Sequence, residues 1–66
     1  MVRSVKITLP KVIAAGTRLF LSQGYRRTRM AEVSARLGVS EGAIFRYVQG
    51  KEALFYLALH SAIEPA

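Results

Sequence analysis

The residues with the clearest chemical meaning lie between Gly38 and Arg46. Glycine at position 38 can adopt a left-handed backbone and reverse the chain without a Cβ clash, and Ser40 is suited to cap a helix that follows. The small residues Gly42 and Ala43 would let this helix approach another molecule closely. Arg46, one turn later, carries a guanidinium that can bond guanine O6 and N7. The pattern predicts contact with base edges in the major groove of DNA.

Two short helices joined by a tight turn would position these side chains. The first begins after Thr28, whose hydroxyl can cap a helix, and ends at Gly38. Its apolar residues share one face at helical spacing: Met30, Val33 and Leu37. The second is expected over residues 41–48, and Val39 in the turn would pin the two together. This is the helix-turn-helix arrangement, whose second helix enters the major groove.

Two further helices are expected around this unit. Pro10 suits the first turn of helix one, and Gly24 suits its C-terminal cap. An apolar stripe connects them: Val12, Ile13, Ala15, Leu19 and Phe20. Gly16 within this helix should cost about 1 kcal/mol relative to alanine, which a closely crossing helix would explain. With Gly50 opening a fourth helix, the sequence predicts an all-α, homeodomain-like bundle of three or four helices.

Composition favours a compact core with a basic surface. The chain has 66 residues, of which 52% are hydrophobic, and a formal net charge of +6. Such a charge favours a polyanionic partner. The sequence has no cysteine and one histidine, His60, so we expect no metal site, no catalytic centre and no cofactor. It also offers no secretion signal or membrane span, and we expect a cytoplasmic location.

The order of motifs along the chain resembles the TetR (tetracycline-repressor) family of bacterial transcriptional regulators. The resemblance to its first helix rests on Val12-Ile13-Ala14-Ala15, Leu19-Phe20 and Gly24-Tyr25. The second helix and turn are matched by Thr28, Glu32-Val33 and Gly38-Val39-Ser40. The most specific run is Gly38 to Tyr47, followed by Lys51-Glu52-Ala53-Leu54. The series continues from Val12 to Leu54 without a gap.

The resemblance implies a set of DNA-contacting residues. Thr28 and Ser40 match positions that cap helices and touch phosphates, whereas Gly42 and Ala43 match the groove-facing start of the recognition helix. Glu41 could accept a hydrogen bond from the N4 amino group of a cytosine, or it could repel incorrect partners. The complete expected set is Thr28, Arg29, Ser40, Glu41, Gly42, Ala43, Phe45, Arg46, Tyr47 and Lys51.

Several of these residues also have a simpler interpretation. Phe45 falls where the family usually has tyrosine, which leaves a stack or a thymine-methyl contact, and Tyr47 matches a phosphate-contacting position; both could instead be core aromatics. Lys51 matches the basic residue that opens helix four, or it could be an ordinary solvated lysine. Arg29 clusters with Arg26 and Arg27 in a segment that either binds phosphate or is a solvated loop.

The resemblance further implies a larger protein and further partners. Residues 1–9 would form a basic arm and the start of helix one, residues 10–50 the DNA-binding domain, and residues 51–66 helix four. Family members continue into a second helical domain that forms a homodimer and binds a small-molecule effector. Because Leu54 to Leu59 is apolar almost all round, helix four is expected to pack against that absent domain. The dimer would bind a palindromic operator, and the effector would release it.

Three other interpretations remain at this point. One is a different helix-turn-helix family, which the match through Lys51-Glu52-Ala53-Leu54 disfavours. Another is a small helical protein-interaction module whose basic charge is incidental. The third is a cationic peptide on a membrane surface, which needs one long amphipathic helix and conflicts with the glycines at positions 24, 38 and 50.

Overall fold

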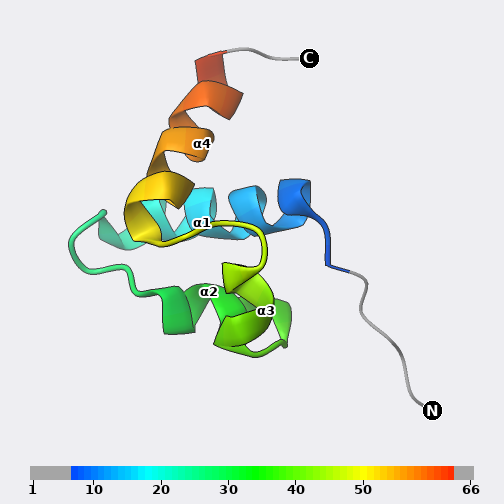
Figure 1. Cartoon of the computed structure of the whole chain (residues 1–66). Helices are drawn as coiled ribbons and strands as arrows, with labels where there is room; N and C mark the ends of the chain where they lie inside the picture. The colour runs from blue at the N-terminus through cyan, green and yellow to red at the C-terminus, as the bar shows by residue number, and fades with distance from the viewer. Residues whose placement is uncertain (1–6, 64–66) are drawn as a thin grey trace.

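The computed structural model describes residues 7–63, which contain four helices and no strand. The helices are α1 (Leu9–Gln23), α2 (Met30–Leu37), α3 (Glu41–Phe45) and α4 (Lys51–Ile63). Helices α2 and α3 lie on one side of α1, while α4 extends away on the other side (Figure 1). The predicted all-α class is confirmed. None of the helices in this part of the chain has the length and apolar character needed to cross a membrane.

Helix α1 follows the predicted signals at both ends. The Thr8 hydroxyl accepts a hydrogen bond from the Lys11 N–H at 3.4 Å, and Pro10 lies in the first turn, where its missing N–H is harmless. At the other end Gly24 has φ +90°, and its N–H donates to the Phe20 carbonyl at 2.9 Å. The expected arm residues Arg3 and Lys6 lie outside the described part of the chain.

The glycine inside α1 marks the crossing of two helices. A Cβ placed on Gly16 would lie 2.6 Å from Leu54 Cδ2 in α4, a distance that real Cβ atoms do not tolerate. Leu54 is itself completely buried. The predicted close approach of another helix is therefore confirmed, and α4 is the helix that approaches.

Helix α2 begins later than predicted, because Thr28 is not its N-cap. The cap position belongs to Arg29, whose N–H donates to Glu32 Oε1 at 3.0 Å. The Thr28 side chain is 1% exposed, and its hydroxyl donates back to the Gly24 carbonyl at 2.8 Å. A threonine hydroxyl can donate or accept, and here it closes the preceding turn. The predicted apolar face is present, with Val33 fully buried.

The turn between α2 and α3 matches the prediction closely. Gly38 is left-handed at φ +73° and ψ +31°, and the Val39 N–H donates to the Ser34 carbonyl at 3.0 Å. The Ser40 hydroxyl accepts from the Ala43 N–H at 3.2 Å and thereby caps α3. The turn is thus fixed by backbone geometry and one serine.

Helix α3 is shorter than the predicted range of 41–48, because it ends at Phe45. The N–H groups of Tyr47 and Val48 both donate to the carbonyl of Ile44, at 2.9 and 3.2 Å. This convergence on one acceptor tightens the chain and ends the regular helix. Arg46 consequently occupies the C-cap position.

The core is made by apolar residues from all four helices and the segment after α3. The fully enclosed members are Val12, Val33, Ile44 and Leu54, with Ala15, Leu19, Phe20, Val48 and Ala58 almost enclosed. Three rings cluster where α1 meets α4: Phe20 and Phe55 lie 5.2 Å apart edge to face, and Tyr25 lies 4.8 Å from Phe55. These contacts fix the end of α1 against the start of α4.

Candidate nucleic-acid interface

Helix α3 has one residue completely buried in the core and leaves most of the others exposed. Ile44 is its only buried residue, while Glu41 and Gly42 are exposed, as is Arg46 at the C-cap. Phe45 is 44% exposed. A phenyl ring this accessible is not a core residue, so the simpler interpretation of Phe45 is wrong. The structure leaves an acid, a ring and a guanidinium available on a single short element.

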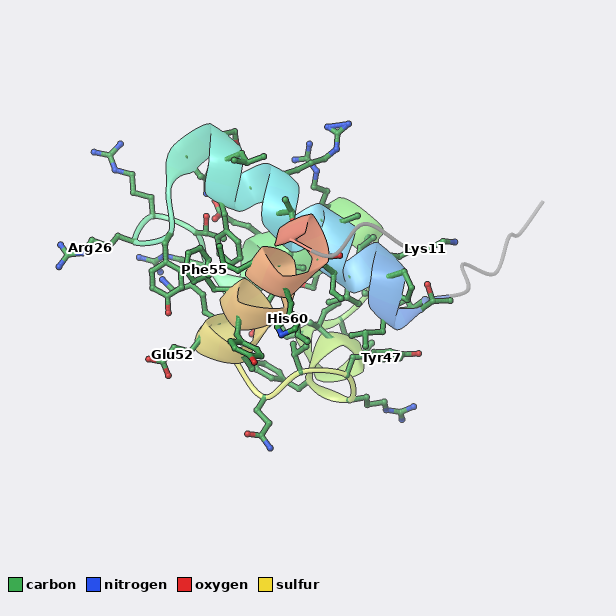
Figure 2. The ribbon with its side chains drawn as sticks, turned by 90° about the horizontal axis from the view of Figure 1, so that it is seen from above. Lys11, Arg26, Tyr47, Glu52, Phe55 and His60 are labelled. Carbon is green, nitrogen blue, oxygen red and sulfur yellow. The ribbon has the colours of Figure 1, made fainter. Side chains whose placement is uncertain are left out.

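Tyr47 is also exposed, at 42%, and is therefore not a core aromatic. Its hydroxyl donates to the carbonyl of Ile7 at 3.0 Å, across 40 residues of sequence. Figure 2 shows the side chain projecting from the edge of the molecule. The contact with the segment before α1 has no counterpart in the sequence pattern, because nothing in the types of these two residues marks them as partners.

The segment from Gly24 to Arg29, which we call the arginine turn, carries a cluster of basic side chains. Arg26, Arg27 and Arg29 are all exposed, and Arg26 extends away from the ribbon in Figure 2. The backbone beneath them is extensively hydrogen-bonded. Gln23 Nε2 donates to the Arg27 carbonyl at 3.1 Å and to Glu32 Oε1 at 2.7 Å. The exposed guanidinium groups are thus carried by a hydrogen-bonded turn, and phosphate binding by these arginines stays a prediction.

Lys51, the first residue of α4, does not extend freely into solvent. Its ammonium donates to the Tyr25 carbonyl at 2.9 Å and to the Arg26 carbonyl at 3.5 Å. The same ammonium lies 4.4 Å from the centre of the Tyr25 ring, within cation–π range. The interpretation of Lys51 as an ordinary solvated lysine is therefore wrong. The sequence gives no signal for the contact, since 26 residues separate Lys51 from Tyr25.

An open hollow of about 520 Å³ lies between the arginine turn and the N-terminal ends of three helices. Its lining residues are Arg26, Thr28, Arg29, Met30, Ala31, Glu41 and Lys51. The structure thus brings together four members of the predicted set around one concave surface: Thr28, Arg29, Glu41 and Lys51. The Thr28 hydroxyl is not available there, because it is buried and already donates to Gly24. A phosphate contact by that hydroxyl would need the turn to rearrange.

The other titratable residues that the structure describes form no metal site. Within the described residues, no group of three or more histidine, cysteine, aspartate or glutamate side chains could hold a metal ion. His60 is exposed, and its ring is tilted by 57° against that of Tyr56, with ring centres 5.2 Å apart. The chemically distinctive surface is therefore the one formed by α3, the arginine turn and the start of α4.

Comparison with known proteins identifies this arrangement. Residues 12–57 match the family described as bacterial regulatory proteins, tetR family. This chain belongs to the TetR family. The match begins in α1 and ends in α4, so it contains both helices of the helix-turn-helix and both turns.

A curated relative has a similar sequence. The HTH-type transcriptional regulator HbdR of Aromatoleum sp. (strain CIB) is 32% identical to this chain over 54 residues. The aligned part is 82% of this chain but 24% of the relative, so the chain spans about a quarter of the relative's length. No solved structure matches the chain.

Proposed function

We propose that this TetR-family chain binds a specific double-stranded DNA sequence with α3 in the major groove, as the DNA-binding part of a transcriptional repressor. The observation that carries the proposal is the shape of α3. One buried residue, Ile44, and one capping residue, Ser40, hold a helix whose other positions are largely exposed. An element of this kind can enter a groove about 12 Å wide without disturbing the core behind it.

The exposed positions of α3 suggest separate roles in base recognition. Arg46 would bond the O6 and N7 atoms of a guanine with its planar fork, and Phe45 would contact a thymine methyl. Glu41 would accept from a cytosine N4 and disfavour other bases. Gly42 and Ala43 would allow close approach of the backbone, since neither side chain holds the helix away from the base edges.

Phosphates on either side of the groove would be bound by residues outside α3. Arg29 and its neighbours in the arginine turn supply charge on one side, and Ser40 and Tyr47 lie near the two ends of α3. The net charge of +6 supports this assignment. Such contacts position the protein on the duplex and make its affinity depend on salt.

The biological form would be a homodimer on a palindromic operator. Two copies of α3 would then lie in successive major grooves, about 34 Å apart, and a small-molecule effector bound in a further domain would release the DNA. The apolar side chains of α4 that face outward, Tyr56 at 61% and Leu59 at 49% exposure, are available for contact with such a domain. The regulator would act on the nucleoid in a bacterial cytoplasm.

The deciding experiment is a fluorescence-anisotropy titration with a randomised duplex pool, followed by selection and sequencing of the bound DNA. We expect a steep fall in affinity with salt and an enriched half-site. Arg46→Ala should reduce discrimination at one base pair by about 1–3 kcal/mol. Arg18→Ala is the matched control, because Arg18 is exposed in α1 beside Ala58 and Ser61 of α4, on another surface.

Each outcome has a definite meaning. An enriched motif that Arg46→Ala alters and Arg18→Ala leaves intact supports groove recognition by α3. Equal losses on selected and random DNA for both variants would contradict the role of Arg46. Absence of binding at low salt would contradict the proposal as a whole and favour a protein-interaction module.

A further inference from the structure

The ammonium of Lys51 is engaged within the protein. It is bound to the Tyr25 and Arg26 carbonyls and faces the Tyr25 ring. We propose that Lys51 is a positioning residue, which promotes DNA binding by fixing the arginine turn rather than by touching a phosphate itself. The inference rests on the proposed function, because it concerns the affinity of this chain for DNA.

The geometry of the ammonium group supports this role. A lysine ammonium has three hydrogens and no acceptor. Two of these hydrogens are directed at the carbonyls 2.9 and 3.5 Å away, and the aromatic face lies 4.4 Å from the nitrogen. Lys51 is also half-buried. A direct phosphate contact would have to use the one remaining hydrogen or sacrifice these bonds.

Lys51 completes the hydrogen bonding of the turn that carries the arginines. The carbonyls from residue 24 to residue 27 all accept: Gly24 from Thr28 Oγ1, Tyr25 from Thr28 N–H and Lys51, Arg26 from Lys51, and Arg27 from Gln23. A carbonyl oxygen facing a phosphate would repel it, because both carry negative charge. Donors inside the protein instead hold these oxygens, and the exposed guanidinium groups are left to meet the DNA.

A fixed turn also lowers the conformational cost of binding. Ordering a mobile segment on association consumes free energy that would otherwise appear as affinity. In this chain the turn has its shape without DNA, and the side chain of Lys51 connects the turn to the start of α4. Loss of the ammonium would therefore weaken several arginine contacts at once, while loss of a direct phosphate contact would weaken only one.

The test is a double-mutant cycle between Lys51→Met and the pair Arg26→Gln/Arg27→Gln, with anisotropy measured on one duplex at several salt concentrations. We expect Lys51→Met to weaken binding roughly tenfold in the wild-type chain and less than about twofold in the arginine-substituted chain. The salt slope should fall by more than the value of about 0.9 that one lost phosphate contact removes. Arg18→Gln is the control for a change of one charge elsewhere.

A second readout needs no DNA and measures the turn directly. The Thr28 N–H donates to the Tyr25 carbonyl at 3.2 Å, and the Val39 N–H of the other turn donates to Ser34 at 3.0 Å. We expect Lys51→Met to lower the hydrogen-exchange protection of Thr28 about tenfold relative to that of Val39. The ratio excludes a general loss of stability, which would affect both amides alike.

The outcomes separate this inference from the proposed function. If Lys51→Met weakens DNA binding equally in both backgrounds, with a slope change of about 0.9 and unchanged Thr28 protection, Lys51 is a direct contact and the inference is overturned. If the wild-type chain binds no DNA, the proposed function fails, and the expected effect of Lys51 on DNA affinity fails with it. Thr28 exchange still decides in that case whether Lys51 fixes the turn.

Discussion

Two of the three segments that connect the described helices are held in different ways. The turn between α2 and α3 is set by the left-handed backbone of Gly38 and by the capping hydroxyl of Ser40, which belong to the turn itself. The arginine turn between α1 and α2 is held by the side chains of Gln23, Thr28 and Lys51. The first turn depends on residues of its own, whereas the arginine turn depends in addition on side chains from two helices, Gln23 of α1 and Lys51 of the distant α4.

The difference concerns how each turn responds to the rest of the molecule. A turn defined by its own glycine and cap keeps its shape when neighbouring helices shift. The arginine turn receives a bond from the first residue of α4, so its shape depends on how α4 packs on α1. The surface proposed to meet DNA thus combines a base-contacting element of fixed geometry with a basic element that depends on α4.

The largest effect that tests this comparison is expected for Gly38→Val. A β-branched residue at φ +73° should lower the free energy of unfolding by about 1–2 kcal/mol. No heavy atom lies within 4 Å of a Cβ at this position, so a clash of the Cβ would not contribute to the loss. Urea unfolding measures it. Gly38→Asn is the control, because asparagine tolerates this conformation better, and an equal loss for both variants would contradict the explanation.

A smaller effect is expected for Thr28→Val in the other turn. Removing the buried hydroxyl breaks the 2.8 Å bond to the Gly24 carbonyl and should lower the free energy of unfolding by about 1 kcal/mol. Thr28→Ser keeps the hydroxyl and serves as the control. If Thr28→Ser loses this stability and Thr28→Val does not, the stabilisation comes from packing of the methyl group, and the turn is not held as described.

The smallest effect on stability is expected outside both turns, for Tyr47→Phe. The lost bond to the Ile7 carbonyl lies at the surface, so the free energy of unfolding should change by no more than about 0.5 kcal/mol. If Tyr47 also contacts a phosphate, affinity should fall to a similar extent on specific and random DNA. Tyr56→Phe in α4 is the matched control. A loss confined to the specific sequence would assign Tyr47 a role in base recognition.

The same contrast explains which parts of the fold could be predicted from the sequence. Gly38 and Ser40 could be interpreted correctly because their roles depend on neighbours one to four residues away. A threonine before an apolar face fits the role of an N-cap, so the sequence predicts that role for Thr28. Only the fold determines that its hydroxyl donates to the Gly24 carbonyl instead. Local chemistry predicts a turn well when the turn contains its own constraints.

The end of α3 and the role of Lys51 could not be predicted from the sequence, because both depend on contacts that the sequence pattern does not show. Ile44 and Val48 are both buried and four residues apart, a spacing that predicts a continuing helix. The tightening at Tyr47 leaves no mark on this pattern. Lys51 meets the turn only because the packing of α4 on α1 brings them together. The family was predicted correctly from the ordered motifs, whereas the individual DNA contacts stay predictions.

The hydroxyl of Tyr47 has one hydrogen for two acceptors, the Ile7 carbonyl and a DNA phosphate. A phenol carries a single hydrogen to donate, and here it goes to the Ile7 carbonyl. A phosphate oxygen that took this hydrogen would free the carbonyl, so anchoring of the chain before α1 and phosphate binding at Tyr47 are competing equilibria. By thermodynamic linkage, each of the two weakens the other by the same factor.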